Sequence, residues 1–333
     1  MRSYHVDSGA GLSGLTLREE PEPTPGPGQV VVAVRAVSLS FRELLILRGE
    51  YVLPVKPDVI PVSDGAGEVV AIGEGVERVR PGDRVTSTLF PRWHDGPYRR
   101  ENAAQIGGSL DGMLTEAAVV DEDALVAMPA HLSFAEAATL PCAALTAWNA
   151  LTGGRPLLAG ETVLTLGSGG VSLFALQLAK LFGARVIATT GSEDKRERLR
   201  ALGADATVNY RTTPGWHDAV RELTGGEGAD HVIDVAGTLE QSLRVVAIGG
   251  EVACVGFVSE RRPPIDPTVV FTAQATVRAI AVGSRAQFAA MNRAIAAGRL
   301  RPVIDRVFAF DEAPAAYRHY ESGQAFGKVV IGR

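Results

Sequence analysis

Features that mark specialised classes of protein are scarce in this sequence. The 333 residues include two cysteines, Cys142 and Cys254, which are too few for a disulfide framework, so we expect both thiols to be reduced. No apolar stretch approaches the roughly 20 residues of a membrane-spanning helix, so no membrane partner is expected. The N-terminal residues, MRSYHVDSGAG, lack the apolar run of a secretion signal, which makes the cytoplasm the expected location.

An excess of one charge is also missing. The chain carries 33 Lys and Arg against 38 Asp and Glu, a net charge of −5, without a long basic run. This balance argues against nucleic acid or an anionic membrane as the main partner. Hydrophobic residues, in contrast, make up 46% of the chain. Together with the length, this content is sufficient for the cores of about two domains.

The first 125 residues have the pattern of short strands separated by turns. Three β-branched runs, Gln29–Val37, Gly67–Ile72 and Asp83–Thr88, alternate with turns rich in glycine and proline. This pattern predicts a compact, barrel-like domain. Residues 91–112 show no clear periodicity, which predicts a loop.

Strands and helices alternate from residue 162 onward. Apolar strands are predicted at Thr162–Leu166, Arg185–Thr189, Ala206–Asn209, His231–Val235, Glu251–Phe257 and Val277–Val282. Such alternation predicts an α/β domain with a doubly wound parallel sheet covered by helices on both faces. A helix at Gln287–Ala297 and a tail of strand and turn character follow, and the tail is expected to rejoin the first domain. The predicted domains are therefore 1–125 with 284–333, and 126–283.

A glycine-rich turn, in the segment TVLTLGSGGVSLFALQLAK, joins the first of these strands to a helix. The residues expected to bind a dinucleotide pyrophosphate there are Gly167, Ser168, Gly169, Gly170 and Val171. A tight turn at Gly167 and the missing side chain at Gly169 let backbone amides and the helix N-terminus face the phosphates. Ser172 takes the place of a third glycine, which weakens the motif without removing it. The alternative is a glycine-rich turn that binds nothing.

The end of the second strand indicates which dinucleotide binds. NAD sites usually place an acid there to hold the ribose hydroxyls, whereas this strand ends in Thr190, Gly191 and Ser192. These small residues leave room for a 2′-phosphate, and Lys195 in the following helix can supply positive charge. The predicted cofactor is therefore NADP(H). Under a shifted register, Glu193 would instead be a ribose-binding acid.

Nearly the whole chain resembles a known family. The runs VVVAVRAVSLSFRELLILRG, PVSDGAGEVVAIGEGVERVRPGDRV and ATLPCAALTAWNAL, with GSGGV and the closing GKVVI, are similar to medium-chain dehydrogenase/reductases. Within this superfamily, the chain most resembles the zinc-free quinone oxidoreductase-like and alcohol dehydrogenase-like members. The resemblance implies a GroES-like β-barrel domain, a Rossmann domain and an active site in the cleft between them. It also implies a homodimer formed through the edge strand at residues 277–282.

The resemblance adds residues to the cofactor site. NADPH-using quinone oxidoreductases place Gly, Lys and Tyr around the 2′-phosphate, and the matching residues here are Gly191, Lys195 and Tyr210. Taken alone, Tyr210 would more often be a packing residue at a strand end. Further residues that the resemblance places at the cofactor are Thr146, Val255, Gly256, Phe257, Gly327 and Lys328.

No metal is expected at the site. In zinc-dependent relatives three side chains hold the catalytic zinc, and the matching residues here are Ser40, Ser63 and Cys142. Two hydroxyls and one thiol make a poor zinc site, because zinc prefers thiolate, imidazole or carboxylate ligands. Asp64 matches a Glu beside the missing ligand. Residues 91–112 lack the four cysteines of a structural zinc lobe.

Hydrogen-bond donors are the expected substitute for the metal. Tyr51 matches the tyrosine that enoyl reductases of this superfamily place near the substrate, although a packed or surface tyrosine is an equal alternative. Ser40 lies where related reductases often carry Asn. Arg42 can hold an anionic group or pair with an acid such as Glu43. Thr146 matches a threonine that approaches the nicotinamide, but it can also bond its own backbone.

These expectations describe an NADPH-dependent, zinc-independent oxidoreductase acting on a small molecule. Hydride would go to the conjugated carbon of a quinone or an activated alkene such as an enone, and hydrogen-bond donors would stabilise the resulting oxyanion. One alternative is a metal-free alcohol dehydrogenase or ketoreductase. Another is a nucleotide-binding sensor or structural protein with little catalysis.

Overall fold

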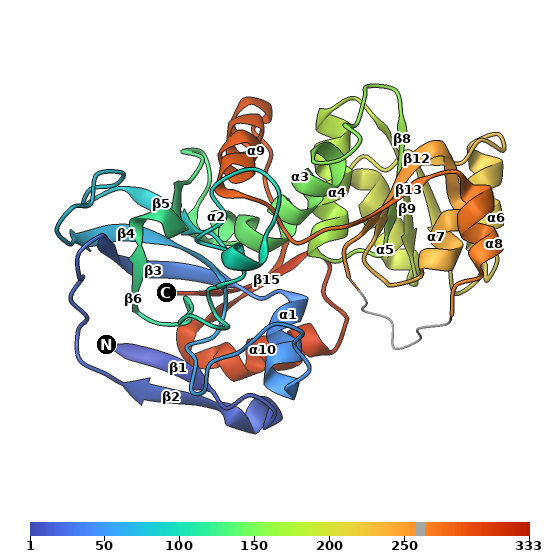
Figure 1. Ribbon diagram of the computed structural model, residues 1–333. Coiled ribbons are helices and arrows are strands. Elements are labelled where there is room, and N and C mark those ends of the chain that lie inside the picture. Colours follow the sequence, from blue (N-terminus) through green and yellow to red (C-terminus); the bar gives the residue numbers. More distant parts are fainter. Residues whose placement is uncertain (257–263) are drawn as a thin grey trace. The chain divides into compact units, whose positions relative to one another are not determined.

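The computed structural model describes residues 1–256 and 264–333 (Figure 1). It separates into two compact units: unit 1 comprises Met1–Leu145 and Gly283–Arg333, and unit 2 comprises Thr146–Val282. The sequence placed a domain boundary at residue 125, whereas residues 126–145 belong to unit 1. The reason is that these residues continue the contacts of unit 1: β7 pairs with β5, and the segment that follows packs against β3, β4 and β5.

The sheet of unit 1 has seven strands and is mostly antiparallel. Its order is β14–β15–β3–β4–β5–β7, with β6 also paired to β3. The strands are β3 (Gln29–Ser38), β4 (Asp64–Ile72), β5 (Arg84–Ser87), β6 (Ala117–Asp121), β7 (Leu125–Ala127), β14 (Ile304–Ala309) and β15 (Lys328–Gly332). Because β15 pairs with β3, the C-terminal residues return to the sheet formed by the N-terminal part.

Helices interrupt the strands of unit 1 at four places. They are α1 (Phe41–Arg48), the series α2 (Phe134–Ala137), η4 (Leu140–Ala144) and α3 (Leu145–Thr152) that leads into unit 2, α9 (Arg285–Gly298) and α10 (Ala313–Glu321). Single 3₁₀ turns are η1 (Gly11–Gly14), η2 (Arg100–Asn102), η3 (Glu122–Ala124) and η5 (Phe310–Glu312). Of these helices, the sequence predicted α9, but not α1 or α10.

Unit 2 is built on a six-stranded parallel sheet in the order β10–β9–β8–β11–β12–β13. The strands are β8 (Thr162–Leu166), β9 (Arg185–Thr190), β10 (Ala206–Asn209), β11 (Ala229–Asp234), β12 (Val246–Cys254) and β13 (Thr276–Ala279). The order reverses between β8 and β11, as in doubly wound dinucleotide-binding sheets, where ligands bind at the carboxyl ends of the strands beside the reversal. This arrangement confirms the predicted parallel sheet.

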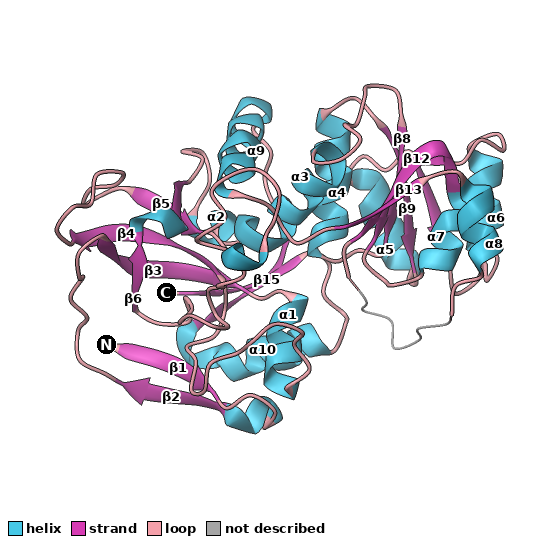
Figure 2. Cartoon of the chain, viewed as in Figure 1, coloured by secondary structure: helices cyan, strands magenta, loops and turns pink. Residues whose placement is uncertain are grey.

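Helices flank the strands of unit 2 (Figure 2). They are α4 (Gly170–Leu181), α5 (Glu193–Ala201), α6 (Trp216–Leu223), α7 (Leu239–Val245) and α8 (Pro267–Ala273). The core contains apolar side chains from neighbouring strands, including Leu164 of β8, Ile187 of β9 and Val232 of β11. None of the helices in the described residues is long and apolar enough to cross a membrane.

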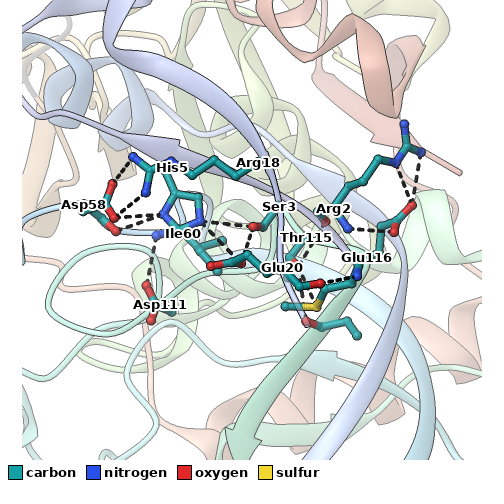
Figure 3. A network of polar contacts seen from close by, with 12 residues as sticks. Arg2, Ser3, His5, Arg18, Glu20, Asp58, Ile60, Asp111, Thr115 and Glu116 are labelled. Carbon is teal, nitrogen blue, oxygen red and sulfur yellow. Dashed lines mark hydrogen bonds and ion pairs between the residues drawn. The ribbon is translucent and has the colours of Figure 1, made fainter. Parts of the chain in front are cut away.

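The N-terminal hairpin of β1 (Arg2–Val6) and β2 (Leu15–Glu19) is fastened by the polar network in Figure 3. Arg2 donates to both carboxylate oxygens of Glu116 through its backbone and side-chain nitrogens. Arg18 pairs with Asp58 through two hydrogen bonds of 2.6 and 2.7 Å. His5 bonds to Ser3 and to the backbone oxygen of Asp58. These contacts explain the hairpin's attachment and involve none of the candidate site residues.

Candidate functional site

The glycine turn after β8 leaves an open cradle in unit 2. Gly167 has φ +81°, a conformation that residues with a Cβ rarely adopt, and its N–H donates to the oxygen of Thr189 over 3.0 Å. A Cβ built on Gly167 or on Gly169 would meet no atom within 4 Å. Neither glycine is therefore required by packing within the protein, and the space beside both can admit a ligand.

The N-terminus of α4 faces this turn without a side-chain cap. Gly169 is the residue that precedes the helix, and no side chain bonds to the first N–H groups of α4. Such N–H groups and the helix dipole favour an anion. Ser172 is buried and donates to the oxygen of Leu166 over 2.7 Å. A small residue thus serves at the third glycine position, and its hydroxyl joins the helix to the strand. This geometry fits a dinucleotide pyrophosphate.

Gly191, at the end of β9, lies against the side chains of Tyr210 and Arg211. A Cβ on Gly191 would lie 2.7 Å from the Tyr210 hydroxyl and 2.9 Å from Nε of Arg211. Tyr210 is 42% exposed and donates its backbone N–H to the oxygen of Thr190. The structure thus brings Gly191 and Tyr210 together and adds Arg211, an exposed cation that the sequence reasoning missed. Its position directly after Tyr210 was the available signal.

Glu193, the alternative ribose-binding acid, is engaged by protein groups. Its carboxylate accepts hydrogen bonds from Nδ2 of Asn209 and, over 2.7 Å, from Arg196. These bonds lower the pKa of Glu193, with Asn209 contributing most. Lys195 lies in the first turn of α5, two residues further on. The Glu193 carboxylate is therefore already bound by protein groups. Lys195 lies on the same helical turn as Glu193.

The remaining cofactor candidates of unit 2 have varied surroundings. Thr190 is buried, and its hydroxyl oxygen accepts from the N–H of Ser192 over 3.4 Å. Val255 and Gly256 follow β12, and each donates its N–H to the oxygen of Asp234. Phe257 lies outside the described residues. The Thr146 side chain is 3% exposed, and no hydrogen bond of its hydroxyl to its own backbone occurs in the described part of the chain.

In unit 1 the residues that match zinc ligands surround one carboxylate, that of Asp64. Its Oδ1 accepts from the Ser63 hydroxyl over 2.7 Å. Its Oδ2 accepts from the Ser40 hydroxyl and from the Cys142 backbone N–H, each over 3.3 Å. The ammonium of Lys328 lies 3.6 Å from the same oxygen. All four polar groups thus meet at a carboxylate that is fully buried.

These residues do not fit a zinc ion. Burial, reinforced by Asp64, raises the pKa of the Cys142 thiol to about 12, and zinc binds the thiolate form of cysteine. The Lys328 ammonium donates to Ser40 Oγ over 2.9 Å and would repel a cation there. Within the described residues, no group of three or more His, Cys, Asp or Glu side chains is placed to hold a metal.

Arg42 and Tyr51 form a second group in unit 1. Nε of Arg42 donates to the Tyr51 hydroxyl over 3.3 Å, and the guanidinium stacks on the phenol ring. The other guanidinium nitrogens donate to Glu43, to Gln105 and to the oxygen of Gly107. Arg42 is thus paired with Glu43 and does not present its guanidinium to an anionic substrate.

Burial sets the acidity of this second group. Burial would lower the pKa of Arg42, but Glu43 and Tyr51 oppose it and raise the pKa overall, so the guanidinium stays charged. Burial raises the pKa of Tyr51, and the neighbouring Arg42 counteracts part of that effect. Tyr51 is partly exposed as a residue, and its raised pKa keeps the hydroxyl protonated. The Cys142 thiol interacts with Ser40 and with Arg42, and therefore links the two groups.

Gly327 and Lys328, the C-terminal cofactor candidates, are both held by unit 1. Gly327 has φ +97°, and a Cβ there would lie 2.4 Å from the oxygen of Val303. Lys328 is 2% exposed, and its ammonium donates to the oxygen of Leu39 over 2.6 Å. Backbone packing thus explains the glycine, and the lysine is directed into the protein toward Ser40.

A surface groove of about 700 Å³ in unit 1 lies elsewhere. It is lined by β7, the chain after it and α9, with Arg78, Arg285 and Arg293 among its side chains. None of the candidate catalytic residues lines it. The groove therefore gives no support to the site described above.

Comparisons with known proteins agree with this architecture. Residues 26–130 match the family model of the alcohol dehydrogenase GroES-like domain, and residues 170–297 match that of zinc-binding dehydrogenases. The second match includes none of Ser40, Ser63 and Cys142. The expected GroES-like domain and Rossmann-type parallel sheet are thereby both confirmed.

Individual relatives extend along most of the chain. A zinc-type alcohol dehydrogenase-like protein of Schizosaccharomyces pombe is 42% identical, covering 91% of this chain and 90% of its own. A chloroplastic quinone-oxidoreductase of Triphysaria versicolor is 32% identical, and the match covers 99% of this chain and 98% of the relative. A solved structure from Sinorhizobium meliloti 1021, named as a candidate alcohol dehydrogenase, is 40% identical with a TM-score of 0.92, covering 100% and 99%.

Proposed function

The chain belongs to the medium-chain dehydrogenase/reductase superfamily, and from this premise we propose that it is a zinc-independent oxidoreductase that uses NADPH to reduce a quinone or an enone. One observation carries the proposal. The carboxylate of Asp64, where zinc-dependent relatives gather their ligands, is surrounded by two hydroxyls, the backbone N–H of Cys142 and an ammonium, and the nearby Cys142 thiol is neutral. This group can donate hydrogen bonds to an oxyanion but is poorly suited to binding a metal.

The cofactor residues of this proposal lie in unit 2. Backbone amides at the turn from Gly167 to Gly170 and the start of α4 would bind the pyrophosphate. Gly191, Lys195, Tyr210 and Arg211 would surround the 2′-phosphate, for which the Tyr210 hydroxyl and the Arg211 guanidinium beside Gly191, together with the charge of Lys195, are suited. NADPH supplies the hydride when bound. The preference for NADPH over NADH rests on these cations and on the pairing of Glu193 with Asn209 and Arg196.

The substrate-side residues of the proposal lie in unit 1. Reduction of an enone or a quinone leaves negative charge on the substrate oxygen, and positioned hydrogen-bond donors stabilise such an oxyanion. Ser40 and Tyr51 each carry a hydroxyl proton for this task. Arg42 is a positioning residue: its Nε–H donates to the Tyr51 oxygen and leaves the phenol proton for the substrate. The similarity to the quinone-oxidoreductase of Triphysaria versicolor supports a quinone as one substrate class.

A homodimer is part of the proposal. β13 is the edge strand of the parallel sheet, and no described strand pairs with the outer side of its backbone. Exposed apolar side chains lie on or near this part of unit 2: Ile248 at 82%, Phe271 at 75%, Val270 at 46% and Val277 at 42%. An unpaired edge with such a patch favours pairing with a second copy. Sedimentation analysis of the purified chain tests this, and a monomer at micromolar concentration would contradict it.

The function itself is tested with purified protein and a substrate panel. NADPH oxidation is followed with quinones, enones, aldehydes and ketones, and the expected result is turnover of quinones or enones that a chelator leaves unchanged. Elemental analysis should find far less than one zinc per chain. Stoichiometric zinc, or no binding of either reduced nicotinamide nucleotide in a fluorescence titration, would overturn the proposal. Turnover restricted to alcohols and ketones would favour a metal-free alcohol dehydrogenase.

A further inference from the structure

The buried ammonium of Lys328 gives its two short hydrogen bonds to neutral oxygens, and its ion pair with Asp64 is longer. It donates to Leu39 O over 2.6 Å and to Ser40 Oγ over 2.9 Å, and its nearest carboxylate oxygen, on Asp64, is 3.6 Å away. A lysine that served packing alone would rarely be 2% exposed without a closer partner for its charge. The geometry thus places the Lys328 charge beside Ser40, one of the two candidate hydrogen-bond donors.

The hydrogen bonds around Ser40 hold its own proton only weakly. A serine hydroxyl has one proton to give and can accept two hydrogen bonds. Here Ser40 Oγ accepts from Lys328, so its proton points elsewhere. The proton is donated to Oδ2 of Asp64 over a long 3.3 Å. A substrate oxyanion can therefore compete for this proton, and the ammonium behind it can replace the proton once it is lost.

We propose that Lys328 is the proton source of the reaction and delivers its proton through Ser40. This inference rests on the proposed function. The substrate gains a hydride from the reduced nicotinamide at its conjugated carbon, and the electron pair of the double bond moves to its oxygen. That oxygen takes the Ser40 proton as the Ser40 O–H bond breaks, and Ser40 Oγ takes a proton from the Lys328 ammonium. Neutral Lys328 then regains a proton from water, which completes the balance.

The charged groups around Lys328 come from several elements. Asp64 of β4 and Cys142 of η4 both interact electrostatically with the ammonium. Arg42 and Glu43 of α1 influence the same carboxylate and thiol, as does Tyr320 of α10. Any of these groups that ionises could alter the pH dependence, so the experiment must identify the lysine itself.

The test compares Lys328→Ala and Ser40→Ala with the control Lys56→Ala, which removes an exposed lysine paired with Asp111. Loss of proton donation should lower kcat of both site variants by about 100-fold or more. Small primary amines added to the buffer should restore turnover to Lys328→Ala, with a rate that depends on the acidity of the amine. They should not restore Ser40→Ala, because the hydroxyl that passes the proton is missing.

A second measurement detects the pair without turnover. The sequence has only four lysines, Lys56, Lys180, Lys195 and Lys328, so the side-chain amine signals of ¹⁵N-labelled protein are simple to assign. The Lys328 signal should move in Ser40→Ala while the other three stay in place.

The outcomes separate the relay from the proposed function. Absence of quinone and enone reduction by the wild-type enzyme would refute the proposed function. With an active wild type, three results would overturn the relay: kcat of Lys328→Ala within about threefold of wild type, weaker NADPH binding with unchanged kcat, or no rescue by amines. Circular dichroism and thermal unfolding of each variant show whether a loss comes from misfolding. Lys328→Met then serves as the second variant, which keeps the buried stem.

Discussion

Arg42 donates its Nε hydrogen to the hydroxyl oxygen of Tyr51 over 3.3 Å, while its guanidinium carbon lies 4.9 Å from the centre of the Tyr51 ring. The phenol oxygen accepts in this bond, so its own proton is directed away from Arg42. Arg42 is itself fixed by Glu43, Gln105 and the oxygen of Gly107. The geometry therefore makes Tyr51 a fixed donor and Arg42 the residue that positions it.

We expect Tyr51→Phe to lower kcat by about 10- to 100-fold, because one oxyanion donor is lost. KM for NADPH should stay unchanged, since no cofactor residue is altered. Arg42→Met should lower kcat by a similar factor and also lower thermal stability, because it leaves Glu43 buried and unpaired. The double variant should be no slower than Tyr51→Phe, as both act through one hydroxyl. Steady-state kinetics of the three variants make this comparison, and additive losses would contradict it.

The strands of unit 2 could be predicted closely because buried parallel strands consist of continuous apolar runs. The predicted bounds of Thr162–Leu166 and Ala206–Asn209 agree with β8 and β10. The prediction for the last strand was wrong at its end: Val277–Val282 was expected, and β13 is Thr276–Ala279. Among the described strands it pairs with β12 alone, and pairing ends where that partner ends, which an apolar run by itself does not show.

Two helices of unit 1, α1 and α10, were missed for a different reason. Residues 41–48, FRELLILR, contain only a short apolar run, LLIL, and such a run does not distinguish strand from helix. Gly49, with φ +70°, ends α1 in a left-handed conformation and was an available signal. The tail was expected to contain only strands and turns, which is wrong for Ala313–Glu321. Pro314 in the first turn of α10 was the corresponding signal.

Contacts between distant residues of the site could not be derived from the sequence. The Lys328–Ser40 bond joins residues 288 positions apart, and the Arg42–Gln105 bond spans 63 positions. The family resemblance located Ser40 and Lys328 separately, and placed the lysine at the cofactor. Only the fold shows that the ammonium is buried and directed to the serine. Gln105 lies in the irregular loop, where no periodicity points to a buried residue.

Gly169→Ala should separate cofactor binding from folding. Gly169 has φ −81°, and a Cβ there meets no atom within 4 Å, so the substitution should leave thermal stability unchanged. If the pyrophosphate occupies this space, the methyl group should raise Kd for NADPH by about tenfold or more, which corresponds to about 1.4 kcal/mol. Fluorescence titration and thermal unfolding provide the two measurements. An unchanged Kd would show that the cradle does not receive the phosphates.

The cations near Gly191 should determine the preference for NADPH. Lys195→Ala and Arg211→Ala should each raise KM for NADPH by about 5- to 50-fold, because each removes one charge-assisted contact with the 2′-phosphate. KM for NADH should change little, since that cofactor has no such phosphate. The matched control is Arg198→Ala, which removes an exposed arginine from α5, the helix that also carries Lys195. Equal effects on both cofactors would refute a phosphate role for the two cations.

Stability in mildly acidic solution should depend on His231 in unit 2. This side chain is 1% exposed, and Arg155 lies 2.9 Å from its Nε2. Burial, with a further contribution from Arg155, lowers the pKa of His231 below its usual 6.5. As pH falls through 6.5, His231 therefore binds a proton in the unfolded chain but not yet in the folded protein. The free energy of unfolding must decrease over this range, down to the pKa of the folded state.

His231→Gln removes the titrating group and keeps an acceptor for Arg155. We expect the free energy of unfolding of the wild type to decrease more between about pH 7.5 and pH 5.5 than that of the variant. The carboxylate of Glu161, 3.5 Å from the same ring, has a lowered pKa, so its own contribution is lost only at more acidic pH, below 4.5. Urea unfolding at both pH values measures the difference. Equal slopes for the two proteins would mean that His231 takes up its proton as readily when folded as when unfolded.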